Sequence, residues 1–300
     1  MKLSANTIAE EFKRIQASIC SGLEALDGKA KFASDLWNRP GGGGGDTRVI
    51  QNGEVFEKGG VNFSAVHGET TPELKQMLNT EAKEFFATGV SIVLHPNNPF
   101  VPIIHMNIRY FELPGTDTYW FGGGIDLTPS YVFEDDAIHF HGEMKALCER
   151  HAAADYQKFK KTADEYFYIP HRGETRGLGG IFFDHLNESS SGFSKEDIAQ
   201  FVFDTGNTFL QSYVTIAEKR KNTSFTPENK EWQLLRRGRY VEFNLIYDRG
   251  TTFGLKTNGR VESILMSLPK HASWEYNFEP KPSSREEISL QYFKKAKDWV

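Results

Sequence analysis

The stretch that decides the fold of this chain is Ser91–Pro129, which reads SIVLHPNNPFVPIIHMNIRYFELPGTDTYWFGGGIDLTP. Within it, residues 103–111 alternate between polar and apolar side chains, a pattern that predicts an extended strand. Residues two apart on a strand face the same way, so His105, Asn107 and Arg109 should share one face. A core strand has no need for an imidazole, an amide and a guanidinium side by side. The alternation therefore predicts a pocket for an anionic ligand.

Periodicity and turn residues extend the prediction outward from this stretch. Apolar residues recurring every three or four positions predict helices over 8–26, 72–88, 135–150, 153–166, 195–219 and 227–235, and a short helix near the C-terminus. Thr7 and Glu10 would cap the first helix and Gly28 would end it. Further strands are predicted over 47–51, 54–57, 90–94, 239–247, 252–256 and 261–268, with a tight turn at Asn52-Gly53. Strands gather at both ends of the chain with helices between, which predicts an α+β class with a large, mainly antiparallel sheet. No linker divides residues 1–300, so a single domain is expected.

Composition limits the classes of function. The 24 Phe, 11 Tyr and 5 Trp imply a large core or a cavity lined by rings. A net charge of -5 argues against a general nucleic-acid binder, so any anionic ligand must be held by local arginines or lysines. Cys20 and Cys148 suit a reduced compartment and provide no disulfide or zinc framework. No apolar run approaches the roughly 20 residues of a membrane span, and no leader is evident, so a cytoplasmic location is expected.

Two glycine runs each leave two interpretations open. Gly41–Gly45 could bind an anion through backbone N–H groups, but no Gly-Lys-Ser/Thr follows, so a flexible lid or linker is favoured. Gly122–Gly124 lies between apolar flanks. This run is either a bulge or close backbone approach, or it leaves room for a flat ligand.

Four of the nine histidines are candidates for chemistry: His95, His105, His141 and His171. Their imidazoles could together bind a divalent metal. No compact motif such as His-Glu-x-x-His supports that site, and the alternative is hydrogen bonding or proton transfer without a metal.

The charged residues divide into candidate ligand-binding groups and structural ones. Arg109 and Arg260 are the favoured carboxylate binders, because a guanidinium offers a two-pronged donor. Arg236 and Arg237 are expected on a solvated surface, while Arg239 and Arg249 are expected to pair with the neighbouring Glu242 and Asp248. Asp184 ends an apolar run and is favoured as functional, and Asp126 as structural.

These motifs together resemble the oxygen-dependent coproporphyrinogen III oxidase family. The matching segments are RPGGGG (39–44), VFEKGGVN (55–62), the histidine–proline segment 95–109, WFGGGIDLTP (120–129), HRGE (171–174), RGLGGIFFD (176–184), RRGRYVEFN (236–244) and ESILMSLP (262–269). The resemblance implies a flat antiparallel sheet flanked by helices on both sides. It also implies a homodimer with contacts near 240–274.

The resemblance further implies a reaction and a set of site residues. The family, an oxidoreductase in haem biosynthesis, converts two propionates of coproporphyrinogen III to vinyl groups with molecular oxygen, giving protoporphyrinogen IX. It casts His105 as proton donor and makes substrate contacts of Ser91, Asn107, Ile108, Arg109, Asn258, Gly259 and Arg260. Some members are described with a metal at the positions of His95, His105, His141 and His171, while others need neither a metal nor an organic cofactor.

Physical reasoning adds further roles to this set. Arg172 or Arg176 would help to hold the propionates, and Asp184 would accept the pyrrole N–H groups. Two rival functions remain open. One is a metal-dependent oxygenase that uses the same histidines, and the other is a tetrapyrrole-binding protein without catalysis.

Overall fold

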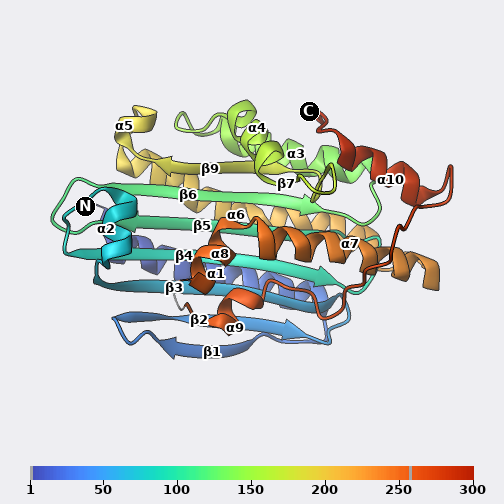
Figure 1. The fold of residues 1–300 in the computed structure, drawn as a ribbon, viewed down its shortest axis with the longest axis horizontal. Coiled ribbons are helices and arrows are strands. Elements are labelled where there is room, and N and C mark those ends of the chain that lie inside the picture. The colour runs from blue at the N-terminus through green and yellow to red at the C-terminus, as the bar shows by residue number, and fades with distance from the viewer. Residues whose placement is uncertain (1–2, 257–258) are drawn as a thin grey trace.

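A seven-stranded antiparallel sheet forms the centre of the computed structural model, which describes residues 3–256 and 259–300 (Figure 1). The strand order is β1-β2-β3-β4-β5-β6-β9, and every neighbouring pair is antiparallel. The strands are β1 (Ala33–Asn38), β2 (Gly43–Gln51), β3 (Phe56–Glu69), β4 (Glu84–Pro96), β5 (Ile103–Glu112), β6 (Tyr119–Thr128) and β9 (Gly180–Leu186). A separate two-stranded hairpin joins β7 (Tyr168–Ile169) to β8 (Glu174–Thr175). The predicted α+β class is confirmed.

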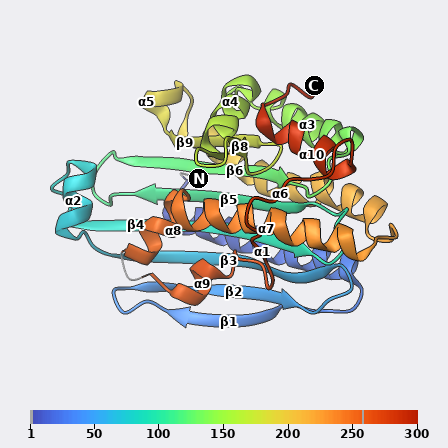
Figure 2. The same cartoon turned by 45° about the vertical axis from the view of Figure 1, so that its right-hand side comes forward.

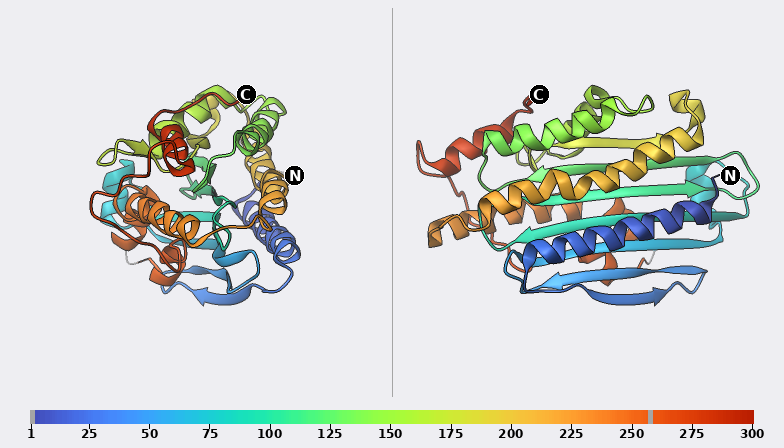
Figure 3. Two further views of the ribbon diagram at one scale, coloured as in Figure 1. Left: turned by 90° about the vertical axis from the view of Figure 1, so that its right-hand side faces the viewer. Right: turned by 180° about the vertical axis from the view of Figure 1, so that it is seen from behind.

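Helices cover both faces of the sheet, as predicted. On one face α1 (Ala5–Asp27) and α6 (Lys195–Arg220) pack side by side against the central strands, with α3 (Glu134–Glu149) against α6 and α4 (Tyr156–Tyr166) against β9 (Figure 3). On the other face lie α7 (Pro227–Ile246), α8 (Arg249–Lys256) and α9 (Val261–Leu265), seen in front of the strands in Figures 1 and 2. The remaining helices are α2 (Pro72–Leu78), α5 (Glu188–Ser191) and α10 (Arg285–Lys294).

The first helix shows how the local sequence sets these elements. Ser4 caps α1 by accepting a hydrogen bond from the backbone N–H of Thr7, so the cap lies three residues before the predicted one. Gly28 ends the helix with a φ of 75°, as predicted, because glycine adopts the left-handed conformation without strain. The buried side of α1, including Ile8 and Phe12, packs on the apolar face of the sheet.

The predicted helix over 72–88 is wrong beyond its first two turns. The helix stops at Leu78, where the C-cap Asn79 takes a φ of 47°. The chain then enters β4, in which Phe85 and Phe86 pair with β3. The spacing of the apolar residues in this segment suits either a helix or a strand. Pairing with β3 and β5 favours the strand.

The predicted strands over 239–247, 252–256 and 261–268 are also wrong. These segments are helical, and α7 continues to Ile246 because Trp232, Leu235, Tyr240 and Phe243 bury one side of it. In α7, packing of this side against the sheet overrides the β-branched and aromatic content of the segment.

Arg236 and Arg237 are buried rather than solvated. Arg236 pairs with Glu174 at 2.6 Å, and Arg237 pairs with Glu57. Each arginine thereby joins α7 to a different part of the fold. Gly43–Gly45 belongs to β2 rather than to a loop.

Candidate functional site

The strand registers place the predicted polar residues on one face of the sheet. His105 on β5 is opposite Val93 on β4 and Asp126 on β6, and Arg109 is opposite Gly89 and Gly122. Residues directly opposite each other point to the same side. The predicted shared face of His105, Asn107 and Arg109 is therefore confirmed. The other side of β5 is fully buried, with Met106 and Ile108 at 0% exposure.

Small residues fill the middle of this face. We call the set Gly45, Ser64, Gly89, Ser91, Gly122 and Gly124 the glycine floor; it crosses β2 to β6 in two adjacent rows of paired residues. Four of its members, on β2, β3 and β4, are half-buried. Helix α7 packs at one end of the face through Tyr240, and α9 covers β2 and β3 through Ser263 and Met266. The other two members, Gly122 and Gly124, are buried. Larger side chains lie over parts of the floor, since a Cβ at Gly45 would meet the ring of Trp37 at 2.5 Å.

His105 is held by a buried ion pair. Its Nδ1 lies 2.7 Å from Oδ1 of Asp126, and Arg176 donates to both oxygens of the same carboxylate at 2.8 and 2.9 Å. Burial alone would raise the pKa of Asp126, but the charge of Arg176 and the hydrogen bond from His105 hold the pKa below its ordinary value. An ionised Asp126 can only accept, so Nδ1 of His105 carries a proton and Nε2 is left for chemistry.

Arg109 and Asp184 form a second, half-exposed pair. Their closest atoms are 2.8 Å apart, and the side chains are 35% and 23% exposed. Arg109 also donates to Oδ1 of Asn107 at 2.9 Å. A Cβ at Gly122 would lie 2.6 Å from Asp184 Oδ1 and 2.8 Å from Arg109 Nε, so only glycine leaves space for the pair. Asp184 thus lies beside a cation on the polar face.

The remaining predicted substrate residues do not all point to this face of the sheet. Ser91 lies on the floor, opposite Asn107, whereas the side chain of Ile108 points into the core. Arg260 lies at the β1 side of the face, 2.5 Å from Asp35, and the backbone N–H of Gly259 donates to Gly254. Asn258 lies outside the described residues. Arg172 makes a two-pronged contact with Glu242 at 2.8 and 2.7 Å.

The four histidines do not converge on one point. His95 contacts the carbonyl of Ser267, His141 contacts Tyr156 and the carbonyl of Leu178, and His171 contacts Tyr247 and Glu242. In the described part of the chain, no three His, Cys, Asp or Glu side chains are arranged to hold a metal ion. The arrangement of these imidazoles therefore does not fit a single metal bound by all four.

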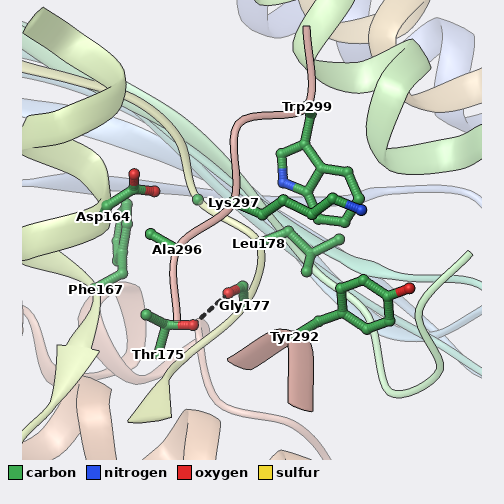
Figure 4. A pocket seen from close by; sticks show the side chains of 10 residues that line it. Asp164, Phe167, Thr175, Gly177, Leu178, Tyr292, Ala296, Lys297 and Trp299 are labelled. Atoms are coloured by element: carbon green, nitrogen blue, oxygen red, sulfur yellow. Dashed lines mark hydrogen bonds between the residues drawn. The ribbon is translucent and has the colours of Figure 1, made fainter. Parts of the chain in front are cut away.

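A small cavity lies away from this face, beside the C-terminal residues. Asp164, Phe167, Thr175, Leu178, Tyr292 and Trp299 are among its lining residues (Figure 4). Its volume of about 10 Å³ is room for about one water molecule. This cavity is too small for an organic substrate.

Asp126 was expected to have a structural role, and its contact with His105 was not predicted. The carboxylate touches His105, and it does so because the two residues are directly opposite in the β5–β6 register. The spacing between the two strands could have indicated this contact only if their register had been known. Local sequence does not supply that register.

Comparison with known proteins agrees with the geometry. A family model described as "Coproporphyrinogen III oxidase" matches residues 7–299. The chain is 50% identical to Coproporphyrinogen-III oxidase 1, chloroplastic, of Arabidopsis thaliana, over 95% of this chain and 76% of that protein. It is 49% identical to the oxygen-dependent coproporphyrinogen-III oxidase of Francisella philomiragia, over 96% of both chains, and 47% identical to that of Prochlorococcus marinus, over 95% and 90%. The chain belongs to the coproporphyrinogen III oxidase family.

Proposed function

We propose that this chain is an oxygen-dependent oxidase that converts coproporphyrinogen III to protoporphyrinogen IX, a step of haem biosynthesis. The observation that carries the proposal is the single sheet face on which His105, Arg109 and the glycine floor lie together. A porphyrinogen is a four-pyrrole ring with four carboxylates. It needs a broad surface, guanidinium partners and a group that handles protons, and this face carries the small residues of the glycine floor, Arg109 and His105.

The chemistry follows from the electron balance of one propionate. The carbon next to the pyrrole loses a hydrogen, and the carboxylate leaves as carbon dioxide, so that its bonding electrons form the vinyl double bond. Molecular oxygen takes up the two electrons of the broken C–H bond, its hydrogen as a proton and one further proton, which gives hydrogen peroxide. We propose that Nε2 of His105 supplies that proton while Asp126 holds the ring through Nδ1.

Asp184 is proposed to stabilise the electron-rich pyrrole. Oδ1 of Asp184 lies near Arg109 and accepts the backbone N–H of His185, so Oδ2 is the atom we assign to accept pyrrole N–H groups. A negative charge at this position favours electron loss from the pyrrole to oxygen. The ring itself then provides the reducing electrons.

Carboxylate binding is proposed for Arg109 and Arg260, together with polar contacts from Ser91 and Asn107. The backbone of Ile108 and Gly259, and Asn258, complete the set that the family pattern suggests. Arg172 and Arg176 already contact Glu242 and Asp126, so we propose that they shape the site through these partners.

We propose that the chain forms a homodimer with contacts in the region 240–274. We also propose that residues 1–300 form a single domain. Support comes from the large apolar side chains exposed there: Leu245, Ile246, Phe253, Leu255, Val261 and Trp274. Such a concentration of exposed apolar side chains is typical of protein–protein contacts. Sedimentation of the purified protein tests this part, and a monomer at micromolar concentration would contradict it.

The cellular location is proposed to be the cytoplasm. Both cysteines are free and buried, which suits a reduced compartment. Within the described ranges, no helix is both long and apolar enough to cross a membrane.

The decisive assay uses purified, chelator-treated protein, coproporphyrinogen III and air, with identification of the product. The proposal expects protoporphyrinogen IX to form at an undiminished rate after chelation. Loss of activity that returns only with a divalent metal would favour the metal-dependent oxygenase. Tight binding without vinyl product would favour a carrier.

A further inference from the structure

The four arginines considered as ligand-binding groups each have a carboxylate partner within the chain. Arg109 pairs with Asp184, Arg260 with Asp35, and Arg172 and Arg176 with Glu242 and Asp126. A ligand with four carboxylates would have to compete with each of these partners. An arginine on the same face without such a partner would bind a propionate at lower cost.

Arg39 meets this description. It follows Asp35 and Trp37 at the end of β1, and Trp37 is opposite Gly45 of the floor, so the alternation places Arg39 toward the same face. Its Nη1 donates to the backbone carbonyl of His67 at 3.0 Å. Among residues 3–256 and 259–300, no carboxylate lies within ion-pair distance of its guanidinium. Since a guanidinium has five N–H donors, most of them remain for a ligand.

A row of stacked rings fixes the position of Arg39. The guanidinium carbon lies 5.4 Å from the centroid of Phe85, whose ring stacks on Phe111 at 6.3 Å. Phe111 stacks on Trp120 at 4.0 Å, and Trp120 on His185 at 5.1 Å. We call Phe85, Phe111, Trp120 and His185 the ring row.

The ring row borders the glycine floor. Phe111 comes two residues after Arg109 on β5, and Trp120 comes two residues before Gly122 on β6. At one end of the row stands Arg39, and at the other stands His185, next to Asp184. Arg39 and Arg109 therefore lie at the same end of the floor. Phe111 marks this end, and it lies about 20 Å from His105 along β5, at roughly 3.3 Å per residue.

Two glycines leave the space that the guanidinium fills. A Cβ at Gly41 would lie 2.5 Å from Nη1 of Arg39, and one at Gly68 would lie 3.2 Å from it. The cation is thus held in place before any ligand arrives, and it is only half-buried. A preorganised guanidinium loses little conformational entropy on binding a carboxylate.

We propose that Arg39 binds a substrate propionate at the end of the floor remote from His105. The inference rests on the proposed function, because it takes the tetracarboxylate substrate from there. The bound propionate is one that is not reacting at that moment. Arg39 is thus a substrate-binding residue that orients the ring for the reaction at His105.

The experiment compares Arg39→Gln, Arg39→Lys and Gly41→Ala with wild-type protein. Gly41→Ala keeps the arginine but displaces its guanidinium, whose flexible side chain can move without unfolding the sheet. The matched control is Arg150→Gln, an exposed arginine after α3 with no carboxylate partner in the described part of the chain. For each protein, kcat and KM are measured in air, and the Kd for coproporphyrinogen III is measured without oxygen at two salt concentrations.

For Arg39→Gln we expect KM and Kd to rise about 10- to 100-fold, the usual effect of losing a charged hydrogen bond, with kcat within about threefold. The salt dependence of Kd should also weaken, because one ion contact is lost. Arg39→Lys and Gly41→Ala should fall between this variant and wild type, and the control should match wild type.

Two results would overturn the proposal. One is an unchanged Kd in Arg39→Gln, and the other is a lowered unfolding temperature with unchanged salt dependence, which would mark Arg39 as a structural residue. A wild-type protein that binds coproporphyrinogen III but forms no vinyl product would instead refute the proposed function, and the anaerobic Kd would still test Arg39.

Discussion

Replacing Asp126 by Asn tests how much the buried ion pair between Asp126 and Arg176, which lies beside His105, stabilises the fold. Asp126 and Arg176 are 1% and 2% exposed, and the centroids of three aromatic rings lie within 4.7 Å of the guanidinium carbon of Arg176. The substitution removes the negative charge and leaves the positive one in this apolar setting. Breaking a buried pair in this way costs about 3–5 kcal/mol.

The expected shift in unfolding temperature follows from the size of the chain. An unfolding entropy of about 2.1 cal/mol/K per residue gives roughly 0.6 kcal/mol/K for 300 residues. The loss for Asp126→Asn is therefore about 5–8 °C. Asp184→Asn is the matched control, because it makes the same change in a half-exposed Asp–Arg pair, where about 0–1 kcal/mol and less than about 2 °C are expected.

The assay is thermal unfolding followed by circular dichroism at neutral pH. A double variant, Asp126→Asn with Arg176→Met, should recover part of the loss, because it also removes the unpaired charge. If Asp126→Asn lowered the midpoint no more than Asp184→Asn, the argument from the buried charge would be refuted. A double variant less stable than both single losses combined would refute it as well.

Three further predictions concern catalysis and pH. His105→Ala should lower kcat by about 10²- to 10⁴-fold with an unchanged circular dichroism spectrum, and near-normal turnover would contradict its role in proton transfer. Gly122→Ala should raise KM about tenfold by displacing Arg109 and Asp184, and an unchanged KM would show that this pair does not meet substrate. Burial opposes ionisation of Glu242, yet the hydrogen bonds from its arginine and histidine partners lower its pKa from 4.5 to about 2. A lowered folded-state pKa contributes stability above pH 4.5 that is lost as the pH falls toward 2, so urea unfolding at pH 6 and pH 4 should show the gap between wild type and Glu242→Gln narrowing.

Local patterns were sufficient where one segment carries its own signal. The alternation through His105 and Arg109 predicted which side chains share a face, because a strand places every second residue on the same side. The period of α1 and the glycine after it predicted that helix and its end. These features depend on neighbours within one turn or one pleat, and such neighbours are always present in the sequence.

Segments with an ambiguous period were predicted less well. The region 239–268 is rich in residues that suit strands, yet it forms helices, and in α7 the buried Tyr240 and Phe243 pack against the sheet. Arg236 and Arg237 were predicted to lie on the surface. Their burial is favourable because Glu174 and Glu57, from distant segments of the chain, pair with them. No local rule anticipates a partner that lies 62 or 180 residues away.

The sequence by itself determined the α+β class, the polar face of β5 and, through its motifs, the family. Only the tertiary structure decided that Asp126 contacts His105 and that Gly122 leaves space for Arg109 and Asp184. It also decided that Arg39 lies on the same face as the glycine floor. The physical reason is strand register. Backbone pairing across the sheet brings together side chains from separate segments, with His105 and Asp126 21 residues apart and Arg109 and Asp184 75 residues apart. Their chemistry exists only once the strands are aligned.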